Sequence, residues 1–203
     1  MTELASNIHE IIKDYRNHDG INLTTEHIID WASQFGNDAE IILTELNKIL
    51  PETYVSRNKA KKYLLDHIKT YLKFYSYTNV TTFLIDTHFI NCQLAHKSQP
   101  AILNLLEEVL EENFQESYKK YLEYPKKNYI YFDDVLASGS TIGRHCVEFL
   151  TKEDEKGVTF AQKLENNEIN FSISVFCVHI WDSNFKNSEF QKLLHFPKKF
   201  QKK

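Results

Sequence analysis

Apolar and polar residues in the first 75 or so positions follow the spacing of amphipathic helices. Four successive segments place apolar residues three or four positions apart, and the second and third segments end near Gly36 and Pro51. Trp31 and Phe35 are four residues apart on the second segment, so we expect both in the core of a helical bundle. The pattern predicts a helical region over residues 1–77.

After Tyr77 the pattern changes to short apolar runs separated by longer helical segments. Residues 80–85 are rich in β-branched and aromatic side chains, which predicts a strand. The polar segment 86–99 reads as a loop, and Pro100 stands where the first residue of a long helix is favoured.

A second strand is predicted at 129–132, which is apolar on both faces as buried parallel strands are. A helical pattern follows from Ile142, a polar segment over 151–170 reads partly as loop, and 171–180 is a third strand. This order predicts an α/β fold with a parallel βαβαβ core over residues 78–203, preceded by the helical region as an N-terminal extension.

Composition narrows the class of protein. The formal net charge of −4 over 203 residues argues against a globally basic nucleic-acid-binding protein. The three cysteines lie far apart without a CxxC pair, as expected for reduced thiols. No apolar run reaches the roughly 20 residues that a membrane span needs, and the N-terminus lacks the apolar segment of a signal peptide. We therefore expect a cytoplasmic protein without a membrane partner.

The segment 129–144 carries the candidate chemistry. Asp133 and Asp134 follow an apolar strand, and a turn of Ser, Gly and Thr separates them from the next helix. Ligands of open parallel sheets bind beyond the carboxyl ends of the strands, and helix N-termini attract anions. Gly139 allows the backbone to approach such an anion closely. The segment predicts a sugar-phosphate site, unless the acids and the turn only cap the helix.

The run YIYFDDVLASGST resembles the phosphoribosyl diphosphate signature of the type I phosphoribosyltransferases. The resemblance implies that Asp133 and Asp134 are catalytic and bind the ribose 2′ and 3′ hydroxyls, directly or through Mg²⁺. It also implies a 5′-phosphate loop made of Ala137, Ser138, Gly139, Ser140 and Thr141. That family replaces the diphosphate on ribose C1 with a nitrogen nucleophile, so the expected ligand is phosphoribosyl diphosphate or a nucleotide, and the expected core is of type I phosphoribosyltransferase fold.

The chain departs from that family in several respects. The family core usually has five parallel strands, whereas three are predicted here. The loop after the first core strand has no glycine; Lys97 and Ser98 at its end are the candidates for diphosphate contact, although Ser98 or Gln99 could simply cap the next helix. The whole chain has three arginines, and Arg forks are common at diphosphate sites. A non-catalytic protein that senses a nucleotide or phosphosugar is therefore an open alternative.

Other residues carry weaker signals. Trp181 follows the third strand, where some purine-specific relatives have a base-stacking aromatic, but a core or rim position is the simpler interpretation. His88, His96 and His179 do not have the spacing of a metal-ligand set.

The helical half has a looser resemblance of its own. Trp31, Gln34 and Phe35, placed ahead of a diverged phosphoribosyltransferase core, resemble the phosphoribosyltransferase-like proteins of bacterial conflict systems, including retron-type antiphage loci. This resemblance implies an antiphage effector and a protein partner for the N-terminal helices. A pure protein-interaction module built on those helices is a third hypothesis.

Overall fold

The computed structural model describes residues 1–95, 97–136 and 139–178. The chain divides into two compact units, Met1–Lys62 and Tyr63–Lys203. The division falls inside helix α4 (Arg57–Phe74). The domain boundary that the sequence pattern predicts, between residues 77 and 78, stays a prediction.

Amphipathic helices build the first unit, as their apolar spacing predicts. They are α1 (Thr2–Ile12), α2 (Thr25–Ser33) and α3 (Ala39–Thr53), linked by the 3-10 turns η1 (Asn17–Asp19) and η2 (Gly36–Asp38). Each α-helix buries one stripe, because its apolar residues recur every three or four positions. The buried members of this core are Ala5, Ile8, Ile28, Ala32, Ala39 and Leu43.

Trp31 and Phe35 do not lie in that core, so the prediction for them is wrong. Trp31 is 45% exposed and Phe35 is 40% exposed, with their rings packed edge to face at 5.1 Å. The stripe that α2 buries runs through Ile28 and Ala32 instead. The buried positions of this contact include three small alanines, Ala5, Ala32 and Ala39, whereas both rings lie outside the core cluster.

Helix α3 also runs further than expected, since it continues through Pro51 to Thr53. Proline removes one backbone donor, but the last turn still closes because the Tyr54 N–H donates to the Leu50 carbonyl at 2.9 Å. Helix α4 then begins after Ser56, whose hydroxyl accepts a hydrogen bond from the Lys59 N–H at 3.2 Å.

The segment predicted as the first strand is a helix, α5 (Val80–Asp86). Its β-branched residues suggested a strand, but Val80, Phe83 and Leu84 have the spacing of one helical face, and all three are buried. The Asn79 side chain caps the helix by accepting a hydrogen bond from the Thr82 N–H at 2.9 Å. Capping and periodicity therefore outweigh strand propensity here.

The first strand, β1 (Thr87–Ile90), lies inside the segment predicted as a loop. It pairs in parallel with β2 (Asn128–Leu136), which pairs in parallel with β3 (Asn170–Val178), so β2 is the central strand. The predicted α/β class with a parallel core is confirmed. Strand β2 is longer than the predicted 129–132 and includes both candidate aspartates.

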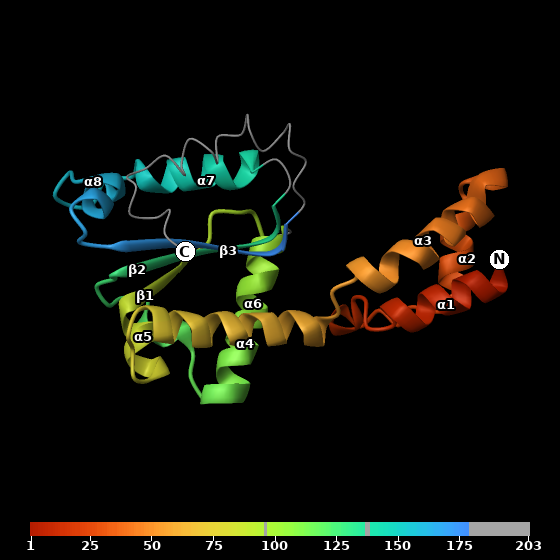
Figure 1. Cartoon of the computed structure of the whole chain (residues 1–203), viewed down its shortest axis with the longest axis horizontal. Helices are drawn as coiled ribbons and strands as arrows, with labels where there is room; N and C mark the ends of the chain where they lie inside the picture. The colour runs from red at the N-terminus through yellow and green to blue at the C-terminus, as the bar shows by residue number, and fades with distance from the viewer. Residues whose placement is uncertain (96, 137–138, 179–203) are drawn as a thin grey trace. The chain divides into compact units, whose positions relative to one another are not determined.

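Helices cover both faces of this sheet, as Figure 1 shows: α7 (Ser140–Leu150) and α8 (Phe160–Glu165) lie over one face, and α5 and α6 (Ser98–Phe114) lie on the other. Helix α8 falls within the segment expected to be partly loop. The 3-10 turn η3 (Tyr118–Tyr121) connects α6 to β2. Among the described residues, no helix is long and apolar enough to cross a lipid bilayer.

Strand β2 is apolar on both faces, as the sequence predicts. Tyr131 packs against Ile142 and Cys146 in the cluster beneath α7. On the opposite face the ring of Phe132 stacks on that of Phe89, with centroids 5.9 Å apart. Both layers remove large side chains from water, and each such side chain stabilises the fold by roughly 1.5–3 kcal/mol.

The last turns of α4 and the residue that follows it, Tyr75, are joined to β3 by hydroxyl groups. Tyr71 Oη lies 2.6 Å from Ser174 Oγ, and Tyr75 Oη lies 2.6 Å from Ser172 Oγ. Four helical residues rise about 6 Å and two strand residues rise about 6.6 Å, so the two spacings match. This match fixes the position of α4 along the sheet.

Loss of the Asn79 cap is expected to destabilise α5 and, with it, the start of β1. Asn79→Ala should lower the free energy of unfolding by about 1 kcal/mol, because the Thr82 N–H loses its acceptor. Thermal unfolding followed by circular dichroism measures the change. Asn79→Ser keeps a capping oxygen and should stay close to the unmodified protein; equal stability of all three proteins would contradict the assigned cap.

Candidate functional site

Both candidate aspartates lie in the part of β2 that extends beyond β1. The β1–β2 register ends with Ile90 opposite Tyr131, whereas β2 continues to Leu136 alongside β3. Asp133 is buried, with 5% of its surface exposed, and Asp134 is exposed. Since side chains alternate along a strand, the two carboxylates start from opposite faces at the carboxyl edge of the sheet.

Asp133 accepts two hydrogen bonds from groups of its own strand. Its Oδ1 accepts a hydrogen bond from the Asp134 N–H at 3.0 Å, and its Oδ2 accepts one from the Tyr131 hydroxyl at 3.2 Å. Burial, together with the neighbouring carboxyl of Asp134, raises the pKa of Asp133. Ionising this carboxyl therefore costs free energy in the folded protein.

Tyr131 links Asp133 to His145 on α7. The Tyr131 hydroxyl lies 2.9 Å from His145 Nδ1, and the side-chain amide of Gln93 donates to it at 3.4 Å. Sequence reasoning missed these contacts. The i, i+2 spacing of Tyr131 and Asp133 on one strand face was the available signal, but nothing in the sequence placed His145 opposite them.

Ser98, the first residue of α6, lies between the two acids. Its hydroxyl donates to Asp134 Oδ1 at 3.1 Å and to Asp133 Oδ1 at 3.4 Å. The N-cap of α6 is Lys97, and no side chain of the described residues caps the helix. The alternative that Ser98 or Gln99 caps α6 is therefore wrong.

The Gln99 side chain connects the loop after β1 to the central strand by hydrogen bonds. It is fully buried, its Oε1 accepts from the Cys92 N–H at 2.8 Å, and its Nε2 donates to the Phe132 carbonyl at 3.1 Å. The side-chain amide thus replaces the backbone pairing that β1 no longer provides. Sequence reasoning considered Gln99 only as a cap and missed this role.

The predicted phosphate loop is described from Gly139 onwards; Ala137 and Ser138 lie outside the described residues. Gly139 has φ 75°, a left-handed conformation that favours glycine, and it is the N-cap of α7. Ser140 and Thr141 form the first turn of α7, and both are exposed. Among the described residues no side-chain hydrogen bond caps α7, and its first turn follows the carboxyl end of β2 in the chain.

The described part of the chain places few cationic or nucleophilic groups near this edge. Lys97 is exposed at the start of α6, and Arg144 is exposed on α7. Burial raises the pKa of Cys92, and burial raises that of Cys146 to about 12. Both thiols therefore stay protonated at neutral pH and are poor nucleophiles.

The donor set at the edge fits Mg²⁺ better than it fits a transition metal. Mg²⁺ in proteins commonly takes one or two carboxylates and fills its other positions with water and substrate phosphates. Asp134 offers an exposed carboxylate, and Asp133 lies next to it. Within the described ranges no group of three or more His, Cys, Asp or Glu side chains could hold a metal on its own.

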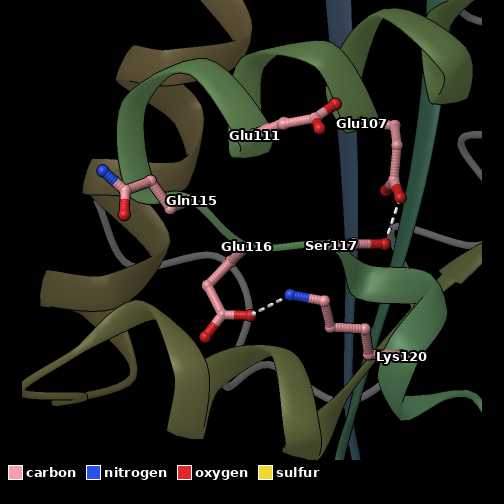
Figure 2. Close-up of a pocket in the computed structure, with 6 residues that line it drawn as sticks. All are labelled: Glu107, Glu111, Gln115, Glu116, Ser117 and Lys120. Carbon is pink, nitrogen blue, oxygen red and sulfur yellow. Dashed lines mark hydrogen bonds and ion pairs between the residues drawn. The ribbon is translucent and has the colours of Figure 1, made fainter.

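A cavity of about 310 Å³ lies at the opposite end of α6 (Figure 2). Its polar lining is mostly acidic, with Glu107, Glu111 and Glu116, and its one lysine, Lys120, is paired with Glu116 at 3.4 Å. Glu107 is nine residues from Ser98, which separates the two places by about 13 Å along the helix. The acidic lining would repel a phosphate ester, so this cavity is not the predicted site.

Comparison with known proteins assigns the chain to a family. The sequence model of PRTase-CE matches residues 28–202. The chain belongs to the PRTase-CE family. This is a phosphoribosyltransferase-like family, as the segment 129–144 indicates. No curated protein and no solved structure matches the chain.

The PRTase-CE match begins inside α2 and spans the sheet, so it covers most of the first unit as well as the candidate site. The strand, the acid pair and the helix of the predicted signature all lie within the matched residues. His96, His179 and Trp181, which the sequence analysis considered, lie outside the described residues.

The raised pKa of Asp133 predicts a pH-dependent loss of stability. A carboxyl with a raised pKa in the folded state favours folding below its unfolded pKa of about 3.9, and this contribution is lost as pH rises through the folded value. Asp133→Asn cannot ionise, so its melting temperature relative to the unmodified protein should rise between pH 4 and pH 7.5, by about 2–4 °C for each kcal/mol.

The measurement is differential scanning fluorimetry in EDTA without ligand. Asp30→Asn, which removes an exposed carboxylate on α2, controls for the loss of one charge. A melting-temperature difference for Asp133→Asn that stays constant across this pH range would contradict the assignment.

Proposed function

We propose that the protein binds phosphoribosyl diphosphate or a related nucleotide at the carboxyl edge of its sheet. The observation that carries this proposal is the meeting of an acid pair with the N-termini of two helices, α6 and α7, beside the central strand. Helix N-termini favour anions and carboxylates bind hydroxyl groups, and a ribose phosphate supplies both. Membership of a phosphoribosyltransferase-like family supports the same ligand class.

The two aspartates would have different tasks in this site. Asp134 is exposed, and its Oδ1 already accepts from the Val135 N–H at 2.9 Å, which orients the carboxylate. Asp134 would therefore contact the ribose hydroxyls or Mg²⁺ directly. Asp133 is buried and its Oδ2 is hydrogen-bonded to Tyr131, so it would contact the ligand through Oδ1. Its bond to Tyr131 would keep this end of β2 in place.

The start of α7 would bind the 5′-phosphate. Gly139 presents a backbone without a side chain, and Ser140 and Thr141 add hydroxyl donors to the first N–H groups of the helix. Ala137 and Ser138 complete the predicted loop. The dipole of an 11-residue helix favours negative charge at this end without an arginine.

The diphosphate would lie toward the start of α6. Lys97 is the exposed cation at this position, and Ser98 could reach a diphosphate only by leaving the carboxylates. When bound, Mg²⁺ would neutralise charge on the departing diphosphate. In the proposed transfer the C1–O bond to diphosphate breaks as a C1–N bond forms, and the attacking nitrogen loses a proton.

A non-catalytic sensor of a nucleotide or phosphosugar is the second candidate. Two observations favour it: the chain has three arginines, and Asp133 is already bonded through both oxygens. Release of diphosphate from phosphoribosyl diphosphate in the presence of a panel of bases separates the two functions. Turnover would exclude a sensor without activity.

A role in antiphage defence in the cytoplasm is a further part of the proposal, and it needs a partner. The exposed and adjoining rings of Trp31 and Phe35 support a protein contact on the first unit, since contiguous exposed apolar surface can mark an interaction site.

The proposal predicts a Mg²⁺-dependent thermal shift. Phosphoribosyl diphosphate at 100 times its dissociation constant should stabilise the protein by roughly 2.7 kcal/mol, while Asp134→Asn should bind at least about tenfold more weakly. Scanning fluorimetry and calorimetry with phosphoribosyl diphosphate, AMP, GMP and ribose 5-phosphate, with and without Mg²⁺, measure both effects.

Asp30→Asn is the matched control, because it removes the same charge from an exposed position of the first unit. Its affinity should equal that of the unmodified protein. If Asp134→Asn binds as tightly as this control, the acid pair does not hold the ligand. If none of the four compounds shifts the melting temperature, the proposed ligand class is wrong.

A further inference from the structure

The Ser98 hydroxyl is the one described group that contacts both candidate acids from another element. It donates toward Oδ1 of each aspartate, at 3.1 Å and 3.4 Å. The position between the two carboxylates is therefore filled by a hydroxyl group of the chain itself. We call this arrangement the Ser98 bridge.

The Ser98 bridge is fixed by its neighbours. Ser98 is part of α6, whose core side chains Ile102, Leu106 and Leu110 are buried. The next residue, Gln99, is fully buried and bonded to Cys92 and Phe132. Because the residues that follow Ser98 are anchored in the core and to β2, the fold holds the hydroxyl near the acids.

A ribose hydroxyl would need the same acceptors. In the proposed function the acids bind vicinal hydroxyls or a hydrated cation, and either would take the lone pairs of Asp133 Oδ1 and Asp134 Oδ1 that the Ser98 bridge occupies. The other carboxylate oxygen of Asp133 is a poor substitute acceptor, because Oδ2 already accepts a hydrogen bond from Tyr131. Ligand and Ser98 therefore compete for the two Oδ1 atoms, and of the four carboxylate oxygens only Asp134 Oδ2 has no partner among the described residues.

We propose that Ser98 is an internal competitor of the ligand: its hydroxyl occupies the acid pair in the free protein and must be displaced when a ribose phosphate binds. This inference rests on the proposed function and deepens it. It also reverses the change in ligand affinity that the sequence predicts for removal of the Ser98 hydroxyl. If Ser98 donated to the diphosphate, its removal would weaken binding, whereas removal of a competitor strengthens binding.

The test compares three variants by calorimetric titration with phosphoribosyl diphosphate and Mg²⁺. Ser98→Ala should bind roughly two- to tenfold more tightly than the unmodified protein, the range of one net hydrogen bond. Ser98→Thr keeps the hydroxyl and should restore the original affinity. Ser140→Ala, at the proposed phosphate loop, should bind more weakly, so the two serines should give opposite signs.

A ligand-free measurement tests the bridge independently. The ¹³Cγ resonances of Asp133 and Asp134 should both shift in Ser98→Ala and return toward their original positions in Ser98→Thr. Unshifted resonances would overturn the inference even if the protein binds the ligand as proposed.

The titration distinguishes the two failures. Binding that is weaker or unchanged in Ser98→Ala overturns internal competition and leaves the proposed function standing. No binding by any of the proteins overturns the proposed function, and the competition with it, whereas binding by Ser98→Ala alone supports both.

Discussion

The extension of β2 beyond the end of β1 is the constraint on which the candidate site depends. Where β1 stops, the central strand would be left with unpaired backbone groups on one side, and buried groups of that kind are costly. The Gln99 amide satisfies one of them at Phe132 and at the same time holds the loop after β1. The next two residues of the strand are Asp133 and Asp134, so the candidate site lies just beyond the end of the β1–β2 pairing.

The α/β class could be predicted from the sequence, because burial on both faces of β2 requires a continuous apolar run, and such a run is typical of a buried parallel strand. The position of β1 could not be predicted, since four residues are too few for a periodic signal. The β-branched run before it became α5 because a cap at Asn79 and three buried side chains on one face outweigh strand propensity. Local composition alone could not resolve this competition.

The acids and the glycine turn could be found from sequence because they are contiguous. The groups that shape them could not, because they approach from elsewhere along the chain: Ser98 is 35 and 36 residues from the two acids, and Gln99 is 33 residues from Phe132. Polar residues at the start of a helix look the same whether they cap it or face a strand. Only the register of α6 against β2 decides between these roles.

Few cations among the described residues lie near the negative charge of the acid pair, and this determines which groups stabilise the two carboxylates. Two helix N-termini supply positive potential, but they lie in the backbone and cannot follow a moving carboxylate as an arginine would. A buried acid beside a second acid therefore needs short-range donors, and Tyr131, Ser98 and the Asp134 N–H provide them. Neutral donors stabilise the pair without cancelling its charge.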